Sequence, residues 1–143
     1  MDATDWNPSF GWTAGGMIST VEDLLTYDRA LGTGQKLVSR DSQVSRLTSW
    51  PEPAGYGFAL GCVDGWVGHT GELPGFNTAL YYDTTSDTSV VVLVNSDISS
   101  GACSESPTLT DNQTDVPCSS PATRVFVGLS GALGHPFTPL PAK

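Results

Sequence analysis

An unbroken apolar run, Val90-Val91-Val92-Leu93-Val94, limits most strongly what this chain can fold into. A strand with one face in water alternates apolar and polar residues, and this run does not alternate at all. It therefore predicts a strand that is covered on both faces. We expect at least one helix to lie on the sheet that contains it.

Turn signals ahead of this run predict an antiparallel sheet of about four strands. Bulky residues alternate with small ones over 56–62, and Asp64-Gly65 then marks a two-residue hairpin that folds the chain back over 66–71. A second hairpin is expected from strands 76–83 and 88–95, turning at 84–87.

Helix signals lie on both sides of these strands. Ser19-Thr20 with Glu22 and Asp23 close behind is typical of a helix start, and Gly32 is expected to end that helix. A shorter helix is predicted over 40–47, capped by Ser39. A third follows Pro121, over 122–134. The residues expected on the buried faces of the three helices are Val21, Leu24, Leu25 and Leu31; Val44 and Leu47; and Ala122, Val125, Phe126, Leu129 and Leu133.

These elements predict a single α+β domain over residues 1–143. A loop and helices are expected over 1–54, antiparallel strands over 55–97, a disulfide loop over 98–121 and a C-terminal helix over 122–134.

The charge balance excludes some partners. The formal net charge is -9, with only 6 Lys plus Arg, so a phosphate backbone would be repelled and nucleic-acid binding is not expected. No apolar run approaches the roughly 20 residues of a membrane span. We expect no cofactor, and no metal site because the cysteines have no short-spaced pair and His69 lies far from His135 in sequence.

Two of the three cysteines, Cys103 and Cys118, bracket a stretch rich in Ser, Thr, Pro and Asp. A disulfide between them would close a loop of about 15 residues and stabilise the fold by roughly 3 kcal/mol. It would also indicate an oxidising, extracytoplasmic compartment. The alternative is a pair of unlinked thiols in a loop. Cys62 lies in a strand pattern and is expected to be a small buried apolar residue.

Three sequence segments occur in the order found in one enzyme family. They are Trp12 to Leu25, Tyr56-Gly-Phe-Ala-Leu60, and Gly68-His-Thr-Gly-Glu-Leu-Pro-Gly-Phe-Asn77. Together they resemble the C-terminal part of serine β-lactamase-like proteins, which include class C β-lactamases, D-alanyl-D-alanine carboxypeptidases and esterases. The similarity covers roughly residues 12 to 97. It implies that the chain is the C-terminal part of a β-lactamase-like domain.

By this resemblance, His69-Thr70-Gly71 is the substrate-facing strand beside the nucleophile. His69 would steer a substrate carboxylate, and the Thr70 hydroxyl would bond it. Gly71 would allow a substrate backbone to approach closely. The backbone N–H of Glu72 would be one donor of an oxyanion hole.

Two other family motifs are missing from this chain. No Ser is followed three positions later by Lys, so the Ser-x-x-Lys nucleophile motif does not occur. None of the four tyrosines forms Tyr-x-Asn or Tyr-x-Ser, which would supply a proton-shuttling phenol. We therefore expect the isolated chain to be inactive.

Three functions remain open. The first is the C-terminal portion of a serine hydrolase that acts on a peptidoglycan peptide, a β-lactam or an ester and needs the missing N-terminal part of the fold. The second is a non-catalytic binding module, and the third is a self-associating unit. For self-association we expect a homodimer through strand 88–95, because the resemblance implies that this strand has lost its flanking strands and forms an open edge. Finding Ser-x-x-Lys upstream of Met1 would favour the first over the second.

Overall fold

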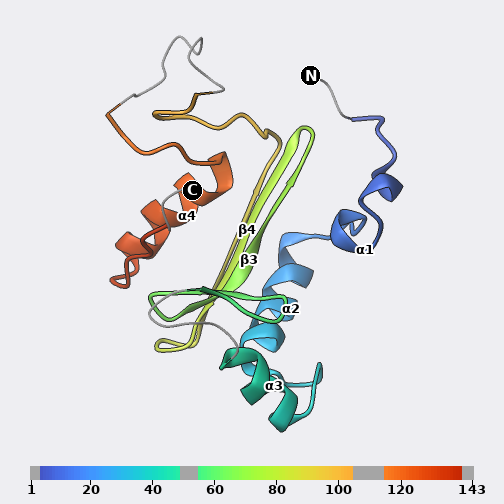
Figure 1. The fold of residues 1–143 in the computed structure, drawn as a ribbon, viewed down its shortest axis with the longest axis vertical. Helices are drawn as coiled ribbons and strands as arrows, with labels where there is room; N and C mark the ends of the chain where they lie inside the picture. Colours follow the sequence, from blue (N-terminus) through green and yellow to red (C-terminus); the bar gives the residue numbers. More distant parts are fainter. Residues whose placement is uncertain (1–3, 49–54, 105–114, 140–143) are drawn as a thin grey trace.

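The computed structural model describes residues 4–48, 55–104 and 115–139 of the 143. Its centre is a five-stranded antiparallel sheet in the order β1-β2-β3-β4-β5 (Figure 1). The strands are β1 (Gly55–Tyr56), β2 (Gly61–Val63), β3 (Trp66–Leu73), β4 (Phe76–Asp83) and β5 (Thr88–Val94). Helices pack on this sheet, which confirms the predicted α+β class.

The prediction of one strand over 56–62 was wrong. This segment forms two strands, β1 and β2, which brings the sheet to five. The Gly57 N–H donates to the Leu60 carbonyl at 2.8 Å, and Ala59 adopts a positive φ of 61°. These two features close a tight turn, so β1 and β2 pair with each other instead of continuing. The small residues that make the segment look like a strand with one flat face also let the backbone fold back here.

The predicted two-residue turn at Asp64-Gly65 is present, and a second two-residue turn joins β3 to β4. Val63 pairs with Trp66 across Asp64 and Gly65, whose φ angles are 52° and 83°. Positive φ at both turn residues is the conformation that a tight hairpin of two twisted strands favours. Leu73 pairs with Phe76 across Pro74 and Gly75, where Gly75 has φ 81°. The hairpin of β4 and β5 turns over 84–87, as predicted.

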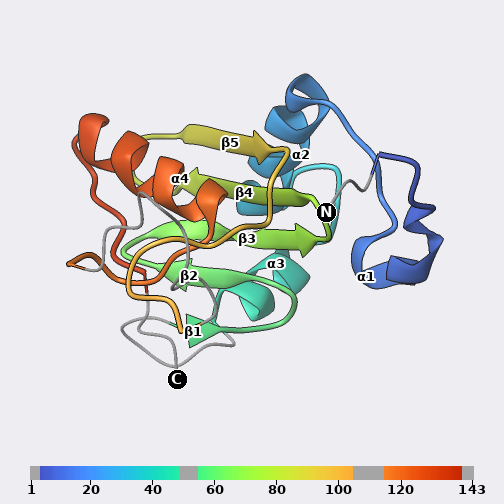
Figure 2. The same cartoon turned by 90° about the horizontal axis from the view of Figure 1, so that it is seen from above.

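Helices cover both faces of the sheet. The helical elements are η1 (Pro8–Gly11), α1 (Trp12–Gly15), α2 (Val21–Thr33), α3 (Arg40–Leu47) and α4 (Pro121–Ala132). Figure 1 shows α2 on one side of the strands and α4 on the other, and Figure 2 shows the strand order from above. Within the described ranges, no helix is long and apolar enough to cross a membrane.

Strand β5 takes part in the core on each face. Val90 and Val92 pack with Trp66, Tyr81 and Phe126 beneath α4, whereas Val91 packs with Leu31 and its neighbours beneath α2. The prediction of a strand covered on both faces is therefore confirmed. The same arrangement buries the adjacent tyrosines Tyr81 and Tyr82, because each points at a different helix-covered face.

Helix α2 begins as predicted and ends later than predicted. The Thr20 hydroxyl accepts a hydrogen bond from the Asp23 N–H at 3.2 Å. Gly32 does not end the helix, since its last residue is Thr33 and Gly34 takes the left-handed φ of 77°. Gly32 lies instead against the ring of Tyr82, where a side chain has no room. Close packing, rather than helix termination, is the reason for glycine at this position.

The predicted buried faces need correction in all three helices. In α2, Val21 and Leu25 are exposed and Asp28 is buried. In α3, whose bounds and Ser39 cap are confirmed, Val44 is exposed and Gln43 is buried. The Gln43 amide donates to the carbonyls of Leu31 and Gly32, which explains a polar residue inside. In α4 the buried residues are Ala122, Phe126 and Ser130, while Val125, Leu129 and Leu133 face outward.

The predicted disulfide between Cys103 and Cys118 is present. Arg124 of α4 supports the segments beside it by donating to the carbonyls of Ser100 at 2.6 Å and Pro117 at 3.1 Å. Cys62 packs against the core cluster beneath α2 but is only half-buried, not fully buried as expected.

Candidate functional site

The predicted site residues lie together on the second half of β3. Residues 66–73 of β3 pair with β4 along their whole length. On the other edge, β2 pairs only with residues 66–68. In the described part of the chain, residues 69–73 are therefore paired on one edge only, and the other edge is open to a ligand.

The two hairpin turns decide which backbone groups face that open edge. The residue pair that closes a two-residue turn is a hydrogen-bonded pair, and such pairs alternate along an antiparallel ladder. Since Leu73 closes the turn to β4, Gly71 and His69 also bond to β4. Trp66 closes the turn to β2, so the even-numbered residues face the other way. The backbone groups of Thr70 and Glu72 therefore point to the open edge.

This alternation places the Glu72 N–H, the predicted oxyanion donor, on the open edge of β3. It is a backbone donor at an exposed position, and no strand covers that edge in the described residues. The role itself needs a second donor and a nucleophile, so it stays a prediction. The geometry establishes only that the group is on the accessible edge.

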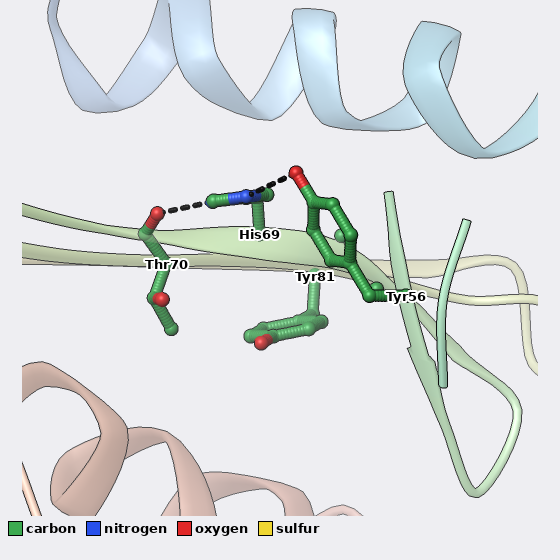
Figure 3. A pocket seen from close by; sticks show the side chains of 6 residues that line it. Tyr56, His69, Thr70 and Tyr81 are labelled. Atoms are coloured by element: carbon green, nitrogen blue, oxygen red, sulfur yellow. Dashed lines mark hydrogen bonds between the residues drawn. The ribbon is translucent and has the colours of Figure 1, made fainter. Parts of the chain in front are cut away.

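His69 is exposed and is held by two contacts. Its Nε2 lies 2.9 Å from the hydroxyl of Tyr56, and its Nδ1 contacts the carbonyl oxygen of Thr70. The Tyr56 ring stands edge-on to the imidazole, with ring centroids 5.3 Å apart. Figure 3 shows His69 and Tyr56 together on one side of the strands.

The side chains of His69 and Thr70 lie on opposite faces, as the strand period predicted (Figure 3). Odd-numbered residues of β3 share the face of Val67, which packs beneath α2. Even-numbered residues share the face of Trp66, which packs beneath α4. A carboxylate that meets both side chains would therefore have to lie at the edge of the strand, not over one face.

A cavity of about 270 Å³ surrounds this part of β3. Its lining residues come from β1 to β4 and are Tyr56, Gly61, Gly68, His69, Thr70 and Tyr81. Among them only His69 can carry a positive charge. Burial raises the pKa of Tyr81 to about 12, because it disfavours the charged phenolate.

Two glycines on β3 have different physical roles. A Cβ added to Gly68 would lie 2.0 Å from the Leu80 carbonyl oxygen, so the close packing of β3 against the backbone of β4 requires glycine here. Gly71 is exposed, and a Cβ there would meet only Thr78, at 3.5 Å. The sheet therefore tolerates a side chain at Gly71, which leaves close approach of a ligand as a reason for glycine.

A family model for Beta-lactamase matches residues 1–110 of the 143. This match covers most of the chain, including α2 and all five strands. The chain belongs to the Beta-lactamase family. Its sheet and its helices α1 to α3 are thus parts of a serine-hydrolase-like fold.

Sequence reasoning missed Tyr56 as a member of the site. Within this Beta-lactamase family chain, Tyr56 does not fit the Tyr-x-Asn pattern, because Phe58 stands two residues later. It reaches His69 only because the chain turns back over Gly57 to Leu60 and pairs β2 with β3. The clustering of Gly57, Ala59 and Gly61 is the sequence signal that indicates such a turn.

Proposed function

We propose that this chain provides the substrate-binding strand of a serine β-lactamase-like hydrolase. The observation that carries the proposal is the open edge of residues 69–73, beside a cavity that contains His69 and Thr70. An extended substrate can add to such an edge through backbone hydrogen bonds. The substrate would be a peptidoglycan stem peptide, a β-lactam or a simple ester.

The nucleophile in this proposal lies on a part of the protein outside this sequence, which contains no Ser-x-x-Lys. The isolated chain then binds substrate weakly and is not acylated by it. The roles proposed from the family are carboxylate binding by His69 and Thr70, close approach at Gly71, and one oxyanion hydrogen bond from the Glu72 N–H. The disulfide supports an extracytoplasmic location.

Titration of the isotopically labelled chain with benzylpenicillin, followed by NMR, tests this proposal. We expect chemical-shift changes concentrated in the cavity-lining residues. Thr70→Ala removes one side-chain hydrogen bond and should weaken binding about 2- to 12-fold. Thr85→Ala, in the exposed turn between β4 and β5, is the matched control and should leave binding unchanged. Shift changes spread over unrelated surfaces, or equal effects of the two variants, would contradict the proposal.

The binding-module alternative uses the same strand without chemistry. It predicts the same titration result. The two functions are distinguished by whether the protein that contains this chain has the catalytic motifs. Ser-x-x-Lys and Tyr-x-Asn in that protein favour the hydrolase. A protein that binds penicillin at this strand and contains neither motif favours the binding module.

A self-associating unit is the third candidate, favoured by the position of β5. This strand is the last in the sheet order of the described residues, and its sequence, Thr-Ser-Val-Val-Val-Leu-Val, has neither charge nor proline. Charged residues and proline normally protect an edge strand from pairing with another chain, and β5 has neither. Antiparallel pairing of strand 88–95 with a second copy would continue the sheet and place each α4 beside its partner. The exposed side chains of Val125, Leu129 and Leu133 give α4 an apolar surface for that contact.

Light scattering at tens of micromolar tests the homodimer. We expect a dimer that strengthens with salt, because each copy carries a net charge of -9. Leu93→Lys places a charge at a half-exposed position of β5 and should give a monomer, whereas Val44→Lys, exposed on α3, should not. A parent chain that is monomeric under these conditions would refute the dimer.

A further inference from the structure

The contacts of His69 determine which of its ring nitrogens carries the proton. A backbone carbonyl can only accept a hydrogen bond, so the contact with the Thr70 oxygen requires a proton on Nδ1. In a neutral imidazole the other nitrogen, Nε2, is then an acceptor. The Tyr56 hydroxyl, 2.9 Å away, must donate to it.

We propose that Tyr56 is the positioning residue of this site, which holds His69 as the Nδ1–H tautomer across the Thr70 carbonyl. The effect of this role on ligand binding rests on the proposed function of the strand. Tyr56 acts through His69 and is distinct from the Tyr-x-Asn phenol of the family, which this chain does not contain.

The local fold is suited to this role. The turn from Gly57 to Leu60 brings β1 beside β2, and β2 pairs with β3 only as far as Gly68. Tyr56 therefore reaches past the end of β2 to the first residue of β3 that lacks a partner strand on that edge. Its ring packs edge-on against the imidazole, which fixes the ring plane as well as the hydrogen bond.

The fixed tautomer changes what the open edge offers to a ligand at Thr70. The Thr70 carbonyl faces this edge and is already occupied by the His69 Nδ1–H. The Thr70 N–H faces the same edge and remains a donor. Neutral His69 has no N–H left to give, so in this form carboxylate binding at this position falls to the Thr70 N–H and hydroxyl, while one lone pair of the Thr70 carbonyl is already used. Tyr56 thereby selects for ligands that bring acceptor oxygens, such as carbonyls or carboxylates.

Nitrogen NMR of the histidine rings tests this inference directly on the folded chain. In the neutral imidazole, we expect the His69 Nδ1 to be protonated and Nε2 to be unprotonated. Tyr56→Phe keeps the ring and removes the hydroxyl, so the ratio of the two tautomers should shift about 2- to 12-fold away from Nδ1–H. Tyr27→Phe, another exposed tyrosine, is the matched control and should not change the ratio.

The second histidine is an internal reference. His135 contacts Asp83 through Nδ1 at 2.9 Å and packs against Trp66 at the start of β3, so its ring signals should be the same in all three proteins. A shift at His135 in Tyr56→Phe would show a general change of structure instead of a local role and would count against the proposal.

Two results would overturn the inference: an Nε2–H tautomer of His69 in the parent chain, or an unchanged ratio in Tyr56→Phe. Neither depends on penicillin binding. If the tautomer is as proposed and penicillin does not bind, the proposed function fails alone. If penicillin binds at the strand and the tautomer is wrong, only the role of Tyr56 fails.

Discussion

Asp28 is the residue whose environment conflicts most with its charge. It is fully buried on α2, and neither carboxylate oxygen has a hydrogen-bond partner in the described residues. Burial raises its pKa from 3.8 to about 7, an effect that the nearby Ser89 hydroxyl only partly opposes. Folding therefore favours the protonated, neutral form of this side chain.

The raised pKa predicts a loss of stability as pH rises. The unfolded chain releases the Asp28 proton near pH 3.8, whereas the folded chain retains it up to about pH 7. The stabilising effect is complete below the lower value and is lost as pH rises through the upper one. At about 1.4 kcal/mol per pKa unit, the loss can reach roughly 4 kcal/mol. Asp28→Asn removes this titration, so urea unfolding at pH 8 should show the variant to be more stable than the parent, with a smaller difference at pH 5. Parallel pH profiles for the two proteins would contradict this explanation.

Gly32 gives a second prediction at this scale. A Cβ added there would lie 2.2 Å from Cδ1 of Tyr82. Gly32→Ala gains about 1 kcal/mol of helix propensity, but overpacking costs about 1–3 kcal/mol. We expect net destabilisation in urea unfolding. Gly128→Ala on α4 is the control: a Cβ there meets no described atom within 4 Å, so propensity should make that variant more stable. A stabilised Gly32→Ala protein would show that Tyr82 moves aside freely.

At the scale of elements, Asn77 of strand β4 caps the start of helix α4, which packs on the sheet. Ser120 precedes α4 but its side chain makes no capping hydrogen bond. Asn77 of β4 takes this role: its Oδ1 accepts from the Ala122 N–H at 2.9 Å, and its Nδ2 donates to the Gly71 carbonyl at 3.2 Å. The start of α4 is therefore connected to the candidate site through a single buried amide.

Asn77→Ala should lower the free energy of unfolding by about 1–3 kcal/mol, because a buried helix N–H loses its partner. The same variant should increase amide hydrogen exchange in the first turn of α4. Asn95→Ala, just after β5 and exposed, is the matched control and should change neither quantity. Equal stability of the two variants would mean that water replaces the cap without cost.

Elements with local signals were predictable from the sequence. Asp64-Gly65 specifies its hairpin through the φ angles of two residues, and Ser39 specifies the start of α3 through one hydrogen bond. The buried face of α4 was not predictable, because Val125 and Phe126 are both apolar and only contact with Trp66 and Tyr81 selects Phe126. The contact of Tyr56 with His69 was missed for a similar reason, since it depends on a turn and two strand pairings at once.

For the whole molecule, the candidate site lies where the β3–β4 hairpin extends beyond the two helix layers. With α2 on one face and α4 on the other, residues 66–68 of β3 are buried, whereas residues 69–72 are exposed (Figure 1). Residues 69–73 of β3 extend beyond β2, so their backbone remains accessible within the described chain. A ligand can therefore approach the His-Thr-Gly strand from its edge.

The central claim is that this chain binds substrate through its His-Thr-Gly strand and contains no nucleophile of its own. Intact-mass spectrometry after incubation with benzylpenicillin tests it most directly, because an acylating serine would retain the whole ligand as a covalent adduct. We predict that the chain keeps its unmodified mass after prolonged incubation at neutral pH. A stoichiometric mass increase equal to one penicillin would contradict the claim.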